Sequence, residues 1–166
     1  MSFDHKAYAF DWHSFSVEMM PWLSQALELS DYARLLSFIR QNVAVCTDPY
    51  EGKPLAPDWE ETVDAKDVQI LADYALTKYY APSDDHGLGG MWIEIDESLP
   101  SDLKAALLGC AMDGFDPGRQ GSYFVSPVDA RRYAGLLHGV ADKAVQAYAR
   151  FLAGVANEGR GLYVTF

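Results

Sequence analysis

The stretch FDHKAYAFDWHSF, residues 3–15, decides how the rest of the chain is interpreted. Tyr8, Phe10 and Trp12 occupy one parity of this stretch, and smaller or more polar residues occupy the other. Side chains alternate between the two faces of a β-strand, and aromatic residues are enriched in strands. The alternation therefore predicts a strand near the N-terminus, with Tyr8, Phe10 and Trp12 directed inward.

The opposite parity of this stretch carries His5, Asp11 and His13, whose imidazole and carboxylate groups are ligand types for a transition metal. An extended strand would hold His5 and His13 about 27 Å apart, so the two side chains are not expected to share one ion. We therefore predict an ordinary polar face here and no metal site.

Three further short strands are expected. Residues 91–96, MWIEID, alternate in polarity and predict a half-buried strand with an acidic exposed face. Residues 122–125 (SYFV) and 162–166 (LYVTF) are rich in aromatic and β-branched types, which favours strands in both places. A terminal strand left at a sheet edge would be an association hazard, so residues 162–166 also raise the alternative of a homodimer or larger homo-oligomer.

Helical patterns fill most of the remaining chain. The clearest start is SPVD, residues 126–129, where Ser126 is the expected cap and Pro127 the first helical residue. This helix is expected to break near His138 and Gly139, because glycine weakens a helix. Other helices are expected to start at Ser16 and at Ser30 with Asp31, and to span residues 67–79 and 101–112. Residues 47–66 are expected to be an irregular connection that holds one brief helical turn.

Few short strands among five or six helices, with no internal repeat or linker, describe a single α+β domain over residues 1–166. We expect a helix-dominated fold with a small, largely antiparallel sheet that includes the N- and C-terminal strands. No apolar run approaches the ~20 residues that a membrane-spanning helix needs, and the first residues resemble no export signal. Cys46 and Cys110 are flanked by small apolar residues and are predicted to be buried free thiols of a cytoplasmic protein.

The net charge of −11 is concentrated in the middle of the chain. Residues 48–102 hold fourteen acidic and three basic residues, whereas the segments on either side are close to neutral. A field of this sign repels nucleic acid and anionic membrane surfaces, and it speeds association with a basic protein. The charge distribution therefore argues against nucleic acid and membrane partners and favours a basic protein partner.

The stretch KYYAPSDDHGLGG, residues 78–90, is the strongest candidate for a functional site. Asp84, Asp85 and His86 could bind a hard cation or act as acid and base, but the spacing matches neither an EF-hand loop nor a phosphate-binding loop. Ser, Asp and Gly also typify an ordinary turn. Aromatic side chains beside carboxylates are good interface anchors, because they bury a large area while keeping a polar end. The predicted binding residues are Tyr79, Tyr80, Asp84, Asp85, His86 and Trp92.

These observations favour a non-enzymatic binding protein of the inhibitor or immunity type, which neutralises a basic protein such as a toxin through residues 48–102 without a cofactor or metal. The first alternative is a metal-assisted hydrolase that uses Asp84, Asp85 and His86, and the second is the homo-oligomeric structural protein. Side chains that converge on one concavity would favour the enzyme, and side chains dispersed over the surface would favour docking.

Overall fold

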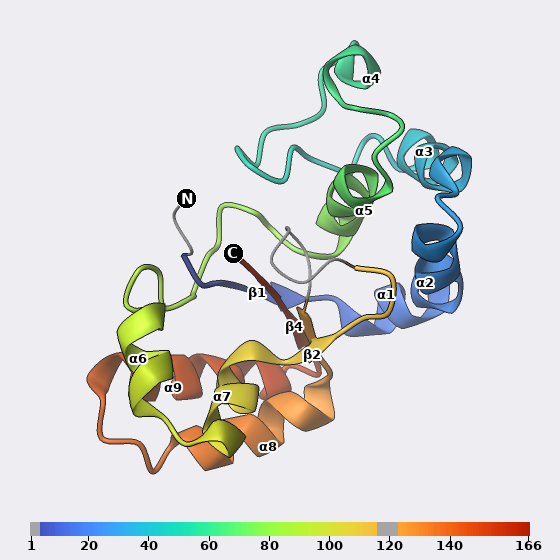
Figure 1. Cartoon of the computed structure of the whole chain (residues 1–166). Helices are drawn as coiled ribbons and strands as arrows, with labels where there is room; N and C mark the ends of the chain where they lie inside the picture. The colour runs from blue at the N-terminus through green and yellow to red at the C-terminus, as the bar shows by residue number, and fades with distance from the viewer. Residues whose placement is uncertain (1–3, 116–122) are drawn as a thin grey trace.

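A small antiparallel sheet runs through the middle of the molecule (Figure 1). The computed structural model describes residues 4–115 and 123–166 of the chain. Within these residues the strand order is β1-β4-β3-β2, and each neighbouring pair is antiparallel. The strands are β1 (Lys6–Phe10), β2 (Cys110–Ala111), β3 (Tyr123–Val125) and β4 (Gly161–Thr165).

Strand β4 comes last in the chain but occupies the interior of the sheet. It pairs with β1, from Lys6 opposite Thr165 to Phe10 opposite Gly161, and with β3 on its other side. The predicted helix-dominated α+β fold, with the N- and C-terminal strands in one small sheet, is confirmed. The expectation that residues 162–166 lie at a free edge, ready to pair with a second copy, is wrong because both sides of β4 are hydrogen-bonded within the chain.

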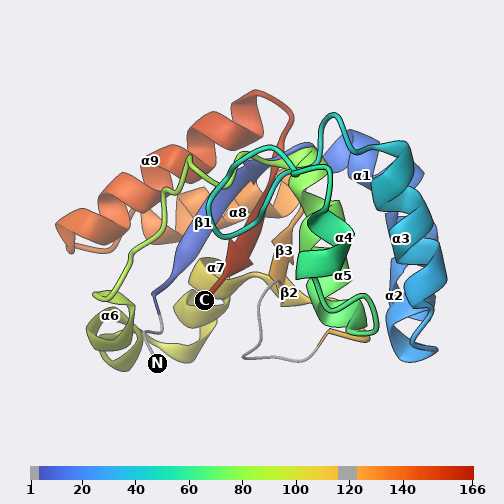
Figure 2. The same ribbon diagram turned by 90° about the horizontal axis from the view of Figure 1, so that it is seen from above.

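Helices cover both faces of the sheet (Figure 2). One face carries α1 (Trp12–Glu18), α2 (Met20–Glu28), α3 (Tyr32–Gln41), α4 (Trp59–Thr62), α5 (Val68–Leu76) and the 3-10 helix η1 (Thr77–Tyr79). The other face carries α6 (Trp92–Ser98), α7 (Ser101–Leu108), α8 (Pro127–Leu137) and α9 (Lys143–Asn157).

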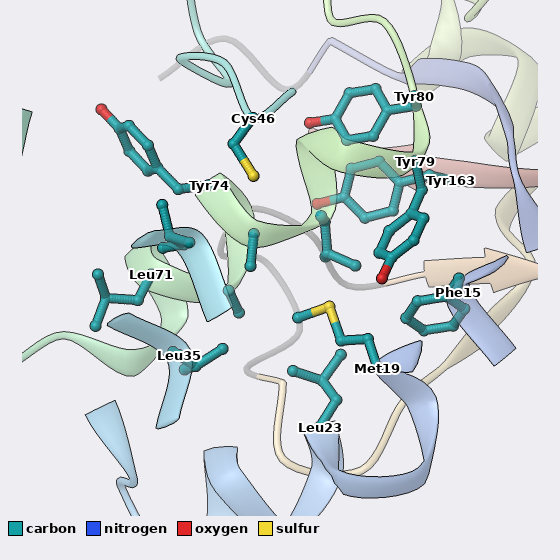
Figure 3. Close-up of a cluster of buried hydrophobic side chains, with 14 of the residues drawn as sticks. Phe15, Met19, Leu23, Leu35, Cys46, Leu71, Tyr74, Tyr79, Tyr80 and Tyr163 are labelled. Atoms are coloured by element: carbon teal, nitrogen blue, oxygen red, sulfur yellow. The ribbon is translucent and has the colours of Figure 1, made fainter. Parts of the chain in front are cut away.

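Strand alternation divides the apolar side chains between two cores. The first core lies against α1–α5 and receives the aromatic strand residues Tyr8, Phe10, Phe124 and Tyr163. Figure 3 shows this core. Phe15 of α1, and Met19 directly after α1, lie close to the tyrosine side chains. The second core lies against α6–α9 and receives Ala7, Val125, Leu162 and Val164. The predicted inward direction of Tyr8 and Phe10 is therefore confirmed.

Helix α1 begins earlier than the sequence pattern predicts. Asp11 accepts a hydrogen bond from the Ser14 amide (3.2 Å) and caps α1, so Trp12 is a helical residue and not an inward-facing strand residue. Ser16, the expected cap, lies inside α1 and donates its hydroxyl proton to the carbonyl of His13. The aromatic alternation continues to Trp12, but the capping carboxylate ends the strand before it.

Residues 91–96 are helical, in α6, and the strand prediction for them is wrong. Trp92, Ile95 and Leu99 follow one another at helical spacing, and all three contribute to the second core. The apparent alternation came from Met91, Ile93 and Ile95, of which only Ile95 is buried, and a six-residue segment is too short to separate the two periods.

Helix α7 ends at Leu108, earlier than predicted. Gly109 follows it with a φ of 87°, and a Cβ atom there would lie 2.7 Å from Cγ2 of Val125. The chain then enters β2, which leaves Cys110 exposed where burial was predicted. Both cysteines are free thiols; Cys46 is buried as predicted, and burial raises its pKa to about 11.

The remaining helix predictions agree with the structure. Ser126 caps α8 by accepting a hydrogen bond from the Asp129 amide (3.1 Å), and the expected break near His138 separates α8 from α9. Residues 47–66 are irregular apart from the short α4, whereas residues 116–122, part of a predicted turn and strand, lie outside the described residues. In the described part of the chain, no helix has the length and apolar character needed to cross a bilayer.

Replacing Phe10 with alanine should lower the free energy of unfolding by about 3–5 kcal/mol, because this ring is fully buried against Phe15 and Tyr163. Urea unfolding at neutral pH measures the change. The control Val128→Ala trims a side chain that is 78% exposed and should change the same quantity by less than about 0.5 kcal/mol. Equal effects of the two substitutions would contradict the position of β1 between the helical layers.

Candidate functional site

Residues 84–90 lie along the outer side of β1, where they take the place of a neighbouring strand. Because β1 pairs with β4 on one side only, its outer side would otherwise present unpaired backbone groups. The His5 amide donates to the carbonyl of Gly89 (3.2 Å), and the Gly89 amide donates to the carbonyl of His5 (2.9 Å). The His86 amide donates to the carbonyl of Ala7 (2.8 Å). The loop that the sequence presents as a candidate site therefore covers an edge of the sheet.

The carboxylate of Asp85 completes this cover. Its Oδ1 atom accepts hydrogen bonds from the amides of Ala7 (3.0 Å) and Gly87 (2.8 Å). The amide of Ala7 belongs to β1, so the Asp85 carboxylate accepts the hydrogen bond that a carbonyl of a neighbouring strand would otherwise accept. Asp85 therefore has a structural role that its position in the sequence does not reveal.

Asp84 and His86 lie on the surface beside α9. Oδ1 of Asp84 is 2.9 Å from Nε2 of His86, and both side chains are exposed to solvent. The His86 ring stacks on the ring of Phe151, with 4.2 Å between the centroids. An exposed pair of this kind contributes little to stability, since solvent screens the charges.

Gly87 permits the close approach of the loop to β1. A Cβ atom at this position would overlap the carbonyl oxygen of His5 and lie 2.6 Å from the Cα atom of Lys6. Both of these are backbone atoms, which cannot move aside as the end of a side chain can. Glycine is therefore required here by space.

Tyr79 is a core residue with a polar contact at its end. The ring lies in the first core (Figure 3), and its hydroxyl donates to Oε2 of Glu18 (3.0 Å). The same carboxylate forms an ion pair with Lys78 (2.6 Å). The hydrogen bonds from Lys78 and Tyr79 lower the pKa of Glu18, and burial together with Glu18 raises the pKa of Tyr79.

Tyr80 also belongs to the first core, where it packs against Tyr8 (4.7 Å between ring centroids) and Tyr163 (4.9 Å). Burial raises the pKa of Tyr80 well above its ordinary value, so its phenol stays protonated. With only 8% of its surface exposed, Tyr80 offers little area to a partner that docks on the outside.

Trp92 of α6 lies on the other side of the sheet, where its ring stacks on that of His5 (5.1 Å between centroids). The six predicted binding residues are therefore dispersed: Tyr79 and Tyr80 lie in the first core, Trp92 packs on the second, and the loop residues line the edge of β1 or the surface. They do not surround one concavity.

The sequence pattern placed His5 on an ordinary polar face of the first strand, and this placement is wrong because the structure buries the side chain. It is fully buried, and both ring nitrogens make hydrogen bonds: Nε2 lies 3.0 Å from the carbonyl oxygen of Leu107, and Nδ1 lies 3.0 Å from the amide nitrogen of Leu88. Burial lowers the pKa of His5. A signal was present in the sequence, because His5 shares its parity with Ala7 and Ala9, the small residues that face the second core.

The acidic segment 48–102 divides between the two helical layers. Trp59 and Val63, at and beside α4, are buried in the first core, and Ile95 of α6 is buried in the second. Figures 1 and 2 both show α4 well apart from α6. The segment therefore forms two acidic surfaces, one around α4 and one around α6, where its linear charge pattern predicted a single region.

Several acidic side chains on these surfaces have cationic partners. Glu60 receives two hydrogen bonds of 2.7 Å from Arg40, and Lys104 lies 3.5 Å from Asp96. Other carboxylates are exposed and make no ion pair or side-chain hydrogen bond within residues 4–115 and 123–166: Asp58 and Glu61 at α4, and Glu94, Glu97 and Asp102 at α6 and the start of α7.

The surface around α6 combines these carboxylates with exposed apolar side chains. Met91 and Ile93 are 54% and 51% exposed, and the helix turns Trp92 and Ile95 inward instead. An apolar centre with a polar rim is typical of a protein–protein interface. We define the α6 surface as Met91, Ile93, Glu94, Glu97 and Asp102.

The geometry gives the hydrolase alternative no support. One oxygen of Asp85 is engaged by two backbone amides, and the His86 ring is held between Asp84 and Phe151. Among the residues that the structure describes, no three His, Cys, Asp or Glu side chains are grouped so as to hold a metal ion. A groove of about 520 Å³ lies between α2, α3 and η1, away from this loop, and its walls include Trp22, Arg34, Phe38 and Lys78.

Comparison of the chain with protein-family models, with curated proteins and with solved structures found no match.

Replacing Gly87 with alanine should lower the free energy of unfolding by at least about 2 kcal/mol, because the new Cβ atom would force the loop away from β1. Chemical unfolding measures the change. Gly135→Ala is the matched control: it lies in α8 with open space around its Cα atom, so alanine there should stabilise the protein by about 0.5–1 kcal/mol. An unchanged free energy of unfolding in Gly87→Ala would show that the loop does not lie as close to β1 as the structure places it.

The adjacent carboxylates should behave differently when each is replaced by alanine. Asp85→Ala leaves the amides of Ala7 and Gly87 without their acceptor and should destabilise the protein by about 1–3 kcal/mol. Asp84→Ala removes only an exposed pair and should cost less than about 1 kcal/mol. Thermal and urea unfolding of both variants provide the comparison, and a larger effect at Asp84 would reverse the assigned roles.

Proposed function

We propose that this protein is a non-enzymatic binding protein that docks a basic protein partner on its α6 surface. The observation that carries the proposal is the pairing of exposed Met91 and Ile93 with neighbouring carboxylates that have no cation of their own among the described residues. The apolar side chains offer area to bury, and the carboxylates select the sign of the partner's charge.

The net charge of −11 supports the same conclusion through kinetics. A protein with this field attracts basic proteins from a distance and orients them before contact, which raises the association rate at low ionic strength. The most concrete form of the function is an inhibitor or immunity-type protein that neutralises a basic enzyme or toxin. The two free thiols are consistent with action in the reducing cytoplasm.

The six predicted binding residues surround no common concavity, which weighs against a catalytic site, although two of them are buried and so do not form a docking face either. An active site needs several reactive side chains within reach of one substrate. Here the tyrosines are packed in a core and Asp85 is bound to backbone amides, so the residues left for recognition are those on the outside.

The test is retention of basic proteins by the immobilised full chain, followed by identification of the retained protein and measurement of its affinity in purified form. The double variant Glu94→Gln, Glu97→Gln should weaken binding about tenfold at low salt, since two carboxylates at the rim of an interface together contribute about 1–2 kcal/mol. Raising the salt concentration should reduce the difference in affinity between this double variant and the original protein.

The matched control is Asp58→Asn, Glu61→Gln, which removes the same charge from exposed, unpaired positions at α4. It should leave the affinity within about twofold of the original protein if the α6 surface is the contact. Failure to retain any basic protein, or equal weakening by both double variants, would refute the assignment of this surface.

A further inference from the structure

His5 lies where the edge of the sheet, the loop 84–90 and the second helical layer meet. Its ring is fully buried and stacks on Trp92 of α6, and it meets the ring of Tyr148 of α9 edge-on (5.4 Å between centroids). The ring of Phe166 lies 5.6 Å away in a similar edge contact. A single imidazole therefore touches elements that are far apart in the chain.

The hydrogen bonds of His5 require one particular form of the ring. The Leu88 amide is a donor, so Nδ1, 3.0 Å away, must accept and carry no proton. Nε2 then carries the proton and donates it to the carbonyl of Leu107 (3.0 Å). A doubly protonated imidazole has no acceptor, so protonation would set two N–H groups against each other at Leu88 and break the bond to the loop.

The surroundings of His5 do little to offset a positive charge. The carboxylate that faces it is that of Asp85, on the loop, which is already bonded to the amides of Ala7 and Gly87. Burial is the largest influence and lowers the pKa of His5 below 6.5, while the bond to Leu107 and the charge of Asp85 oppose it only in part.

The other elements around the ring present neutral groups. α6 contributes the indole of Trp92, and α7 contributes the carbonyl of Leu107. α9 contributes the phenol of Tyr148, whose pKa is raised by burial, and whose hydroxyl donates to the same carbonyl (3.4 Å). None of these groups changes its charge at mildly acidic pH, so His5 is the group in this cluster that takes up a proton.

Helix α6 depends on this site for its position. It has seven residues, and an isolated helix below about 12–15 residues is marginal in water. Ile95 is its one buried residue in the structure. The stack of Trp92 on His5 is therefore one of a small number of attachments, beside the contact of Trp92 with Phe166 and the pair of Asp96 with Lys104.

We propose that His5 is a protonation-sensitive latch, whose neutral ring holds the loop 85–89 and α6 against the sheet and whose protonation releases them. The latch would remove the α6 surface on acidification, and the functional meaning of that loss rests on the proposed function. The latch itself is a property of the free protein and stands or falls without any partner.

The sign of the pH dependence follows from the neutral closed form. An opened state has a solvated histidine with the ordinary pKa of 6.5, so below that pH it binds a proton that the closed state excludes. The closed state is thus fully stable above pH 6.5 and weakens as the pH falls, by up to about tenfold in its equilibrium constant per pH unit.

Amide hydrogen exchange of the free, full-length protein tests the latch at about pH 7.5 and about pH 5.5. Each observed rate is divided by the intrinsic rate at the same pH to give a protection factor. The amides of Leu88, Gly89 and α6 should lose about tenfold in protection at the lower pH, whereas those of α2 and α3 should not.

Two variants separate the latch from a general effect of acid. His5→Gln keeps a donor and an acceptor but cannot titrate, so its loop should show equal protection at both pH values. His138→Gln removes an exposed histidine at the end of α8 and should behave like the original protein. If His5→Gln does not fold, an NMR titration of the His5 ring in the original protein replaces it, and the midpoint should coincide with the loss of protection.

Protection that stays constant with pH, or that falls equally over the whole chain, would overturn the latch, as would an unchanged response in His5→Gln. These results concern the free protein, so they leave the partner assay unaffected. Conversely, a protein that retains no basic partner could still show the latch, and the two proposals therefore fail separately.

Discussion

The outer side of β1 is the constraint on which the rest of the structure depends. This strand has a strand neighbour on one side only, yet its two faces contribute to both cores. The loop 84–90 supplies the missing neighbour through backbone hydrogen bonds, the carboxylate of Asp85 and the space left at Gly87. His5 joins the same edge to α6 and α7. Sheet, loop and second helical layer thus meet at this edge.

Features of the fold that are encoded locally could be predicted from the sequence. The alternation around Tyr8 and Phe10, and the cap at Ser126, each depend on a few neighbouring residues. The strand order could not be predicted, because pairing of β4 with both β1 and β3 depends on residues far away in the chain. Residues 91–96 were assigned to the wrong element because Met91, Ile93 and Ile95 alternate with Glu94 and Asp96, whereas the helix buries Ile95 and leaves Met91 and Ile93 exposed.

The sequence drew attention to the loop 84–90 as a candidate site, and the structure adds a role for it in the fold. Asp85 resembles a ligand or a base until its partner is known, and that partner is an amide 78 positions away in the chain. The concentration of acidic residues between 48 and 102 does not by itself predict a single acidic surface, because this segment passes from one helical layer of the fold to the other. His5 could have been noticed as a polar residue in a row of small buried ones, but its bonding to Leu88 and Leu107 depends on tertiary structure.

The attachment at His5 can be observed most directly through the nitrogen atoms of its ring. A long-range ¹H–¹⁵N NMR spectrum at neutral pH distinguishes a protonated ring nitrogen from an unprotonated one. The account predicts a neutral ring with the proton on Nε2 and a bare Nδ1 that accepts from Leu88. A proton on Nδ1, or a ring that is charged at neutral pH, would contradict the way in which the edge of the sheet, the loop and α6 are held together.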